Sequence, residues 1–295
     1  MAARAIDGLA LARAQRRQAA AAQAPWLHGE VARRMAERLS VIRQQPEAVI
    51  DWCSHAGASQ ALLAAAYPQA RQIRVEAMPV AEVHGAASAP WWTTRRWRRE
   101  AASIVAADLP PAAGQLLWAN MMLHTVADPT VLMRAWRRAL SIEGFLMFST
   151  LGPDTLGPLR ELYREAGWGP PHAPFTDMHD FGDMLIEAGF ADPVMDQERL
   201  TLTWATPEAL LAELRGLGGN ADPARFAGLR TPHWRVRLMA ALRERAGADG
   251  RIALEFELVY GHAFNPPPRA KVAGETRVAL DDLRAMARSG RRAGP

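Results

Sequence analysis

The chain has 295 residues, of which 49% are hydrophobic and 22% are charged, so it is long enough to bury a full core in one sizeable domain with additions. It has no apolar run long enough to cross a bilayer, and residues 1–23 lack the apolar core of a secretory signal, so we expect a cytoplasmic protein. A net charge of +4 is only a weak argument for an anionic partner. An acidic carrier protein and a nucleic acid would both fit that description.

The sequence predicts helices over residues 9–44, where arginines stand between apolar residues. The apolar residues that recur at helical spacing are Trp26, Leu27, Val31, Met35, Leu39 and Ile42. We expect these helices to cover one side of a sheet, and we treat residues 1–47 as an N-terminal helical cap. Since residues 1–23 are rich in alanine and arginine and poor in acids, an organelle transit peptide is the alternative to an alanine-rich helix.

Residues 48–57 read AVIDWCSHAG, which predicts a buried strand with Asp51 at its end, a turn that closes on Gly57, and a helix over residues 58–67. Strand, turn and helix form half of a βαβ unit, whose turn can bind a ligand through backbone N–H groups. The residues alone leave a cofactor-binding turn and a merely structural turn open, because Cys53 to Ala56 stand where a nucleotide-type turn carries glycines. Cys53 is the only cysteine, which excludes an intrachain disulfide and a multi-cysteine metal site.

The next three predicted strands also end in polar side chains. Residues 72–78 alternate like a strand that ends in Glu76, where a carboxylate can hold both hydroxyls of a ribose; an exposed strand-end charge is the alternative. Residues 103–110 predict a third strand closed by Asp108, and residues 115–120 predict a fourth that ends in Asn120. Because the carboxyl ends of parallel strands meet at one edge of a sheet, we expect these side chains and Asp51 to face one crevice.

A helix from Pro129 to Leu140, capped by Asp128, precedes a fifth buried strand over residues 144–150. Because strands and helices alternate, the pattern predicts an α/β fold with a mainly parallel, doubly wound sheet. Between the second and third strands, residues 84–103 combine tryptophans with a basic run at 94–99. That segment favours either a solvated loop anchored by its tryptophans or a contact with nucleic acid.

Several later segments resemble a known family. Residues 144–162 (GFLMFSTLGPDTLGPLREL), residues 175–204 and the closing LEFELVYGHAF at 254–264 are similar to the methyltransferases that esterify malonyl-acyl-carrier protein at the start of biotin synthesis. The resemblance covers about residues 26–264 and implies the class I, Rossmann-like fold of S-adenosylmethionine-dependent methyltransferases. It implies a methyltransferase-like domain over residues 48–264, with a seven-stranded sheet and a helical insertion over about 206–250 before the last strand.

The resemblance also implies roles for five residues. Asp51 matches the acid that closes the first strand beneath the cofactor, S-adenosylmethionine, and Gly57 matches the last glycine of the cofactor turn. Glu76 matches the acid that holds the ribose hydroxyls, and Asp108 matches the acid beside the adenine amino group. Asn120 would line the methyl-donor end of the site.

Three features depart from the family. Its cofactor turn reads approximately LDLGCGTG, whereas this chain has IDWCSHAG, so Cys53 and His55 replace glycines where the backbone must approach the ligand closely. The family's tyrosine before its first long helix is absent from residues 18–24. Pro174 stands where we expect an arginine that pairs with the malonyl carboxylate.

Two functions follow from these observations. The first is a methyltransferase that moves a methyl group from S-adenosylmethionine to the free carboxyl of malonyl-acyl-carrier protein, with His124 and His172 as substrate residues. No general base is required, because a carboxylate is already a nucleophile at neutral pH. The second is a non-catalytic relative in which a decayed cofactor turn serves a binding or assembly role. We expect residues 265–295 to form a disordered basic tail with one helical segment over 276–288.

Overall fold

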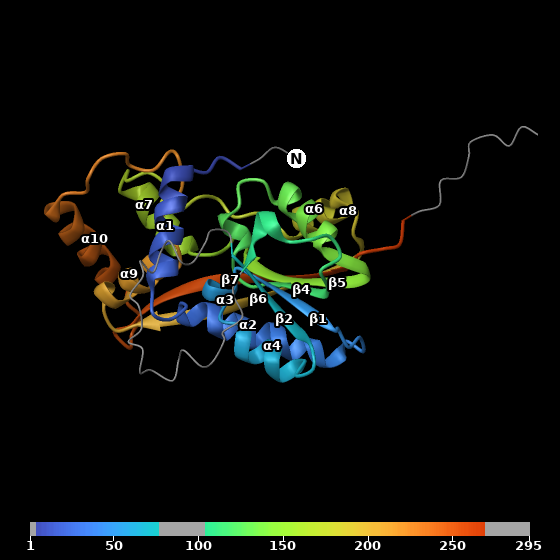
Figure 1. Cartoon of the computed structure of the whole chain (residues 1–295). Helices are drawn as coiled ribbons and strands as arrows, with labels where there is room; N and C mark the ends of the chain where they lie inside the picture. The colour runs from blue at the N-terminus through green and yellow to red at the C-terminus, as the bar shows by residue number, and fades with distance from the viewer. Residues whose placement is uncertain (1–3, 77–103, 269–295) are drawn as a thin grey trace, which may run out of the picture.

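A computed structural model of the chain describes residues 4–76 and 104–268 (Figure 1). Within these ranges, seven strands form one sheet in the order β3-β2-β1-β4-β5-β7-β6. Strand β7 pairs antiparallel with β5 and β6, and the other neighbours are parallel. The strands are β1 (Ala48–Trp52), β2 (Arg71–Glu76), β3 (Ile104–Val105), β4 (Gly114–Ala119), β5 (Leu140–Leu151), β6 (Ala191–Trp204) and β7 (Ile252–Phe264). The predicted mostly parallel, seven-stranded sheet is confirmed.

Helices cover both faces of this sheet, with α2 and α4 on one face and α6 and α8 on the other (Figure 1). The α-helices of the described ranges are α1 (Gly8–Ala20), α2 (Trp26–Arg38), α3 (Ser54–Gly57), α4 (Gln60–Ala66), α6 (Pro129–Ala139), α7 (Gly157–Glu165), α8 (Met178–Ala188), α9 (Pro207–Gly216) and α10 (Pro232–Glu244). Because strand side chains alternate, Val49 faces the core under α2 and Ile50 faces the core under α6. The strand order reverses between β1 and β4, which places a crevice at their carboxyl ends.

Helices α9 and α10 lie between β6 and β7 in the chain, where a helical insertion was expected. Each begins at a Thr-Pro pair, because the threonine hydroxyl caps the first turn and proline fits the first helical position: Thr206 accepts from Ala209 and Thr231 from Trp234. Both helices gather with α1 and α7 at one end of the molecule (Figure 1). Their buried leucines extend the core on the α2 side of the sheet.

The third strand is shorter than the predicted span of residues 103–110. Strand β3 contains only Ile104–Val105, and a 3-10 helix, Ala106–Asp108, follows it. Among the strands of residues 4–76 and 104–268, β3 lies at the edge of the sheet and pairs with β2 alone. Since Pro110 and Pro111 have no N–H to donate to a ladder, the strand cannot extend through them. Asp108 is the last residue of the 3-10 helix and is exposed.

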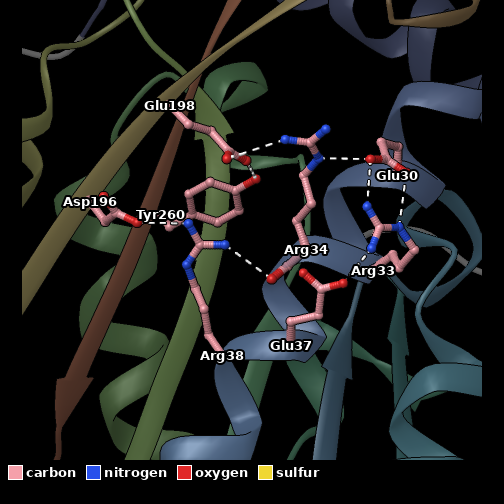
Figure 2. Close-up of polar contacts among 8 residues, drawn as sticks. All are labelled: Glu30, Arg33, Arg34, Glu37, Arg38, Asp196, Glu198 and Tyr260. Carbon is pink, nitrogen blue, oxygen red and sulfur yellow. Dashed lines mark hydrogen bonds and ion pairs between the residues drawn. The ribbon is translucent and has the colours of Figure 1, made fainter.

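Helix α2 is fixed to the far edge of the sheet by the polar cluster of Figure 2. Arg34 lies 3.3 Å from Glu198 of β6, and Arg38 lies 2.7 Å from Asp196 of the same strand. The Arg38 guanidinium also sits 3.8 Å from the centre of the Tyr260 ring on β7, and the Tyr260 hydroxyl donates to Glu198. Burial, together with that carboxylate, raises the pKa of Tyr260. These contacts hold α2 in a fixed position over the sheet.

Several expectations fall on residues outside the described ranges. They are the tryptophan-rich and basic segment at 84–103, most of the predicted tail, and the helical segment at 276–288. The division at residues 47 and 264 stays a prediction. Among the described helices, none is both long enough and apolar enough to span a membrane.

Gly261 of β7 lets the last strand pack against the core. A Cβ at this position would lie 2.1 Å from Cε1 of Phe148, whose ring is fully buried between Trp136 and Phe181. We therefore expect Gly261→Ala to lower the free energy of unfolding by about 1–3 kcal/mol through overpacking, measured by urea denaturation. The matched control is Gly157→Ala, whose Cβ meets nothing within 4 Å. Equal stabilities for the two variants would contradict the prediction.

Candidate functional site

The turn after β1 has the backbone shape that glycine favours. Cys53 adopts φ 56°, ψ 46°, and Ala58 adopts φ 56°, so two left-handed residues enclose the single helical turn of α3. Each such residue with a Cβ costs about 1–2 kcal/mol. The helix predicted over residues 58–67 is therefore shorter, because α4 begins at Gln60 and ends at Ala66. The Cys53 N–H donates to the Val75 carbonyl at 2.7 Å, which extends the β1–β2 pairing into the turn.

Two carboxylates lie beneath and beside this turn. The Ser54 hydroxyl donates to Oδ2 of Asp51 at 2.6 Å, and the backbone N–H of His55 donates to Oε1 of Glu76 at 2.8 Å. Burial raises the pKa of Asp51 to about 7; the Ser54 hydrogen bond opposes this rise, and the Glu76 charge adds to it. Burial also raises the pKa of Glu76, against the His55 N–H. Oδ1 of Asp51 is buried and accepts no hydrogen bond from the described residues.

Asn120 joins the other end of the turn to the sheet. Its Nδ2 donates to the Gly57 carbonyl at 2.6 Å and to the His28 carbonyl at 2.8 Å, and its Oδ1 accepts from the Ser149 hydroxyl at 2.6 Å. A Cβ on Gly57 would lie 3.7 Å from Cβ of Asn120, so the two residues pack closely. The structure thus brings Asp51, Gly57, Glu76 and Asn120 to one turn. Asp108 is exposed at the end of the 3-10 helix after β3, and its place in the same crevice stays a prediction.

The side chains of Trp52 and Cys53, at the start of the turn, pack on one side of the sheet. The Trp52 indole lies edge-on to Trp136, with ring centres 6.1 Å apart, in the core under α6. Cys53 is half-buried and packs against the same core. His55 is half-buried, and its backbone N–H points to Glu76. The indole and the thiol are therefore directed into the α6 side of the sheet.

A cavity of about 1020 Å³ lies between α1, α7, α9 and α10. His124 and His172 both line it, with Phe175 between them: the His172 ring stacks on Phe175 at 4.6 Å, and the His124 ring meets it edge-on at 6.1 Å. Burial lowers the pKa of His124 to about 3 and also lowers that of His172, so both rings are neutral at pH 7. The two predicted substrate residues therefore lie on one wall.

The cavity carries a basic lining that sequence reasoning missed. Glu208 is the one acidic residue among the described residues that line the cavity. Four arginines line it as well, namely Arg17, Arg215, Arg230 and Arg235. Helix α1 forms part of the wall, because its Arg17 donates to the Gly218 carbonyl at 3.1 Å. Helix α1 thus lies against the loop after α9, whereas the prediction placed all the N-terminal helices over the sheet. Pro174 is exposed and does not line this cavity.

The half-buried Arg4 and the buried His28 are two further groups that the sequence analysis did not single out. The Arg4 guanidinium donates to the carbonyls of Leu123 and Val126, and burial lowers its pKa to about 10, so it stays charged at pH 7. Nδ1 of His28 lies 2.7 Å from the Ala56 carbonyl. A signal for His28 was present, because it stands beside Leu27 on the apolar face of a predicted helix, where a polar residue needs a partner.

The chain is similar to curated malonyl-(acyl-carrier protein) O-methyltransferases. It is 37% identical to that of Halorhodospira halophila over 263 residues, which is 88% of each chain. It is 38% identical to that of Laribacter hongkongensis over 265 residues, which is 88% of this chain and 87% of the relative. No protein-family model matches the chain.

Solved structures share the fold. The YcgJ protein of Bacillus subtilis has a TM-score of 0.52 at 12% identity and covers 81% of this chain and 99% of its own. A putative methyltransferase of Bacillus halodurans has a TM-score of 0.51 at 13% identity and covers 79% of this chain and 99% of its own. At these identities the likeness shows the fold alone, which is that of class I methyltransferases.

Proposed function

We infer the function from one premise, which is that the chain belongs to the family of malonyl-(acyl-carrier protein) O-methyltransferases. The chain is an S-adenosylmethionine-dependent O-methyltransferase, and its substrate is the free carboxyl of a malonyl group on acyl carrier protein, in biotin synthesis. One observation carries this proposal: Asn120 holds the turn after β1, and His124, four residues later, lines the large cavity. A cofactor on the turn and an acceptor in the cavity would therefore meet at one segment.

The residues of the turn fit the cofactor. Buried Oδ1 of Asp51 accepts no hydrogen bond from the described residues, and the Trp52 indole is packed away from the turn in the α6 core. In our proposal Glu76 holds the ribose hydroxyls, Gly57 lets the backbone approach the ligand, and Asn120 lines the methyl-donor end. Asp108, exposed beyond β3, accepts from the adenine amino group. The left-handed backbone at Cys53 supports this fit, because it keeps the shape of a glycine turn.

The chain's task in the reaction is to position and desolvate the acceptor. When bound, S-adenosylmethionine supplies an electrophilic methyl group, and S-adenosylhomocysteine leaves. The malonyl carboxylate is ionised at neutral pH, so no side chain has to remove a proton. The apolar wall that holds His124 and Phe175 excludes water around the reacting carboxylate, and the arginine lining attracts an anionic substrate. We propose His124 and His172 as residues that contact the acceptor.

The alternative of a decayed, non-catalytic module gains no support from the relatives, which are named as methyltransferases. The sharpest test is methyl transfer from labelled S-adenosylmethionine to malonyl-acyl-carrier protein, with acetyl-acyl-carrier protein as the control substrate that lacks the free carboxyl. We expect label only in the malonyl form, and we expect the gene to rescue a biotin auxotroph. Absence of transfer, together with absence of binding in a calorimeter, would overturn the proposal.

Replacing Glu76 tests the cofactor site directly. Glu76→Ala removes a carboxylate that in our proposal accepts from two hydroxyls, so we expect binding of S-adenosylmethionine to weaken by about 1–3 kcal/mol in calorimetry. Glu76→Gln keeps an oxygen for the His55 N–H but loses an acceptor, and we expect an intermediate loss. Glu187→Ala, which removes an exposed carboxylate paired with Arg134, is the control. An unchanged dissociation constant in Glu76→Ala would remove Glu76 from the site.

A further inference from the structure

Arg230 is a cation that lines the large cavity without an anionic partner. It forms no ion pair with any carboxylate of the residues that the structure describes. Glu208, the one acid of the described cavity wall, is already paired with Arg243 at 3.0 Å. The cavity therefore holds positive charge that its own wall does not neutralise, and such a charge favours an anionic ligand.

Two aromatic rings and a carbonyl hold the guanidinium of Arg230 in place. The guanidinium sits 4.1 Å from the centre of the Phe226 ring and 4.5 Å from that of the Trp234 ring, and its Nη2 donates to the Trp168 carbonyl. Nε and Nη1 of Arg230 donate to no described residue, yet neither atom is sealed from water. These N–H groups therefore remain for charge-assisted hydrogen bonds to an oxyanion in the cavity.

The hydroxyl of Tyr163 adds a neutral donor near this cation. Tyr163 lines the same cavity, and its ring meets that of Trp234 edge-on, with ring centres 6.3 Å apart. Burial raises the pKa of Tyr163, against the charge of Arg230, so the hydroxyl keeps its proton at pH 7. It makes no hydrogen bond with any described residue and is not sealed from water. A guanidinium and a hydroxyl with donors to spare match the oxygens of one anion.

The malonyl carboxylate is not this anion, because it reacts elsewhere in the cavity. His124 follows the central strand β4, four residues after Asn120, whereas Arg230 precedes α10 at one end of the molecule (Figure 1). The anion at Arg230 is therefore a part of the acceptor that is remote from the malonyl group. On a carrier protein, the acyl group is a thioester at the end of a long arm, and a phosphodiester joins the other end of that arm to the protein.

We propose that the guanidinium of Arg230 binds the phosphate of the arm that carries the malonyl group, and that the Tyr163 hydroxyl donates to the same phosphate. This assignment rests on the proposed function and adds to it a binding site for the far end of the acceptor. Both side chains line a cavity, which a flexible arm can enter and a folded carrier protein cannot. Because the guanidinium is already held between two rings, it loses little conformational freedom when the phosphate binds.

The test compares the binding of phosphopantetheine and pantetheine, two forms of the arm that differ by one phosphate, in a calorimeter. We expect the wild-type protein to bind the phosphorylated form roughly 10- to 100-fold more tightly. Arg230→Gln can still donate to the Trp168 carbonyl but has no charge, and should bring this ratio to within roughly 3-fold of unity. Arg230→Lys keeps the charge without the planar fork, and should keep part of the ratio. Tyr163→Phe should lower the ratio by roughly 3- to 10-fold.

The matched control is Arg237→Gln. Arg237 is an exposed arginine of α10 that lies 5.6 Å from the Trp168 ring but does not line the cavity, so this variant should keep the wild-type ratio. Thermal unfolding of each variant shows whether it is folded, and Arg230→Lys and Tyr163→Phe keep the test decisive if Arg230→Gln is not.

The outcomes separate this assignment from the proposed function. A wild-type ratio near unity, or an unchanged ratio in Arg230→Gln, would refute the phosphate contact. A higher KM for malonyl-acyl-carrier protein in Arg230→Gln, with the ratio unchanged, would place the carrier protein itself at this arginine and would also overturn the assignment. If the ratio falls in Arg230→Gln as expected but the wild-type protein transfers no methyl group, the phosphate site stands and the proposed function fails.

Discussion

Replacing Asn120 with alanine should lower the free energy of unfolding by at least about 3 kcal/mol, because three buried groups lose their partner at about 1–3 kcal/mol each. The Gly57 and His28 carbonyls lose their donor, and the Ser149 hydroxyl loses its acceptor. All three lie in the core, where water cannot replace the side chain. Urea denaturation of the purified protein measures the effect.

A graded control accompanies this variant. Ser149→Ala removes two hydrogen bonds, the one to Oδ1 of Asn120 and the 3.1 Å one from the Met121 N–H. We therefore expect a smaller loss of unfolding free energy, about 1–2 kcal/mol. Asn120→Ala should also weaken cofactor binding, since the Gly57 end of the turn is no longer held. A loss below that of Ser149→Ala would show that Asn120 does not connect the turn to the sheet.

Asp51 should make the protein less stable as the pH rises from 3.8, its ordinary pKa, to its folded-state pKa of about 7. Its pKa is about 7 in the folded protein against an ordinary value of 3.8, so the native state holds an extra proton between these values. Stability then falls with increasing pH across that window, by about 4 kcal/mol for about three pKa units. Below the window the carboxyl is protonated in both states and the penalty is absent.

Asp51→Asn isolates this contribution. Asparagine keeps a carbonyl oxygen for the Ser54 hydroxyl but cannot ionise, so its unfolding free energy should lack the fall between acidic and neutral pH and should exceed the wild-type value above pH 7. Chemical denaturation at several pH values measures both curves. Asp154→Asn, which changes an exposed partner of Arg199, should keep the wild-type slope. Parallel curves for Asp51→Asn and the wild-type protein would refute the buried charge penalty.

Much of the site was predictable because its residues follow strands. Asp51, Glu76 and Asn120 were identified from short apolar runs that end in polar residues, and parallel pairing brings such ends together. The same reasoning placed Asp108 on a strand, whereas in the described residues β3 gives way to a 3-10 helix after Val105. The sequence predicted crowding of the turn by the side chains of Cys53 and His55. It did not predict that the backbone at Cys53 keeps the left-handed conformation that glycine favours.

The sequence by itself determined the period of each element, the ends of the central strands and the family, since these depend on neighbouring residues and on whole-segment likeness. Only the tertiary structure decided that His28 meets Ala56, that Arg4 meets Val126 and that α1 lines the cavity. The physical reason is that such contacts join residues 28 to 122 positions apart. Their partners are set by the path of the folded chain and by the exclusion of water from the polar atoms that it buries.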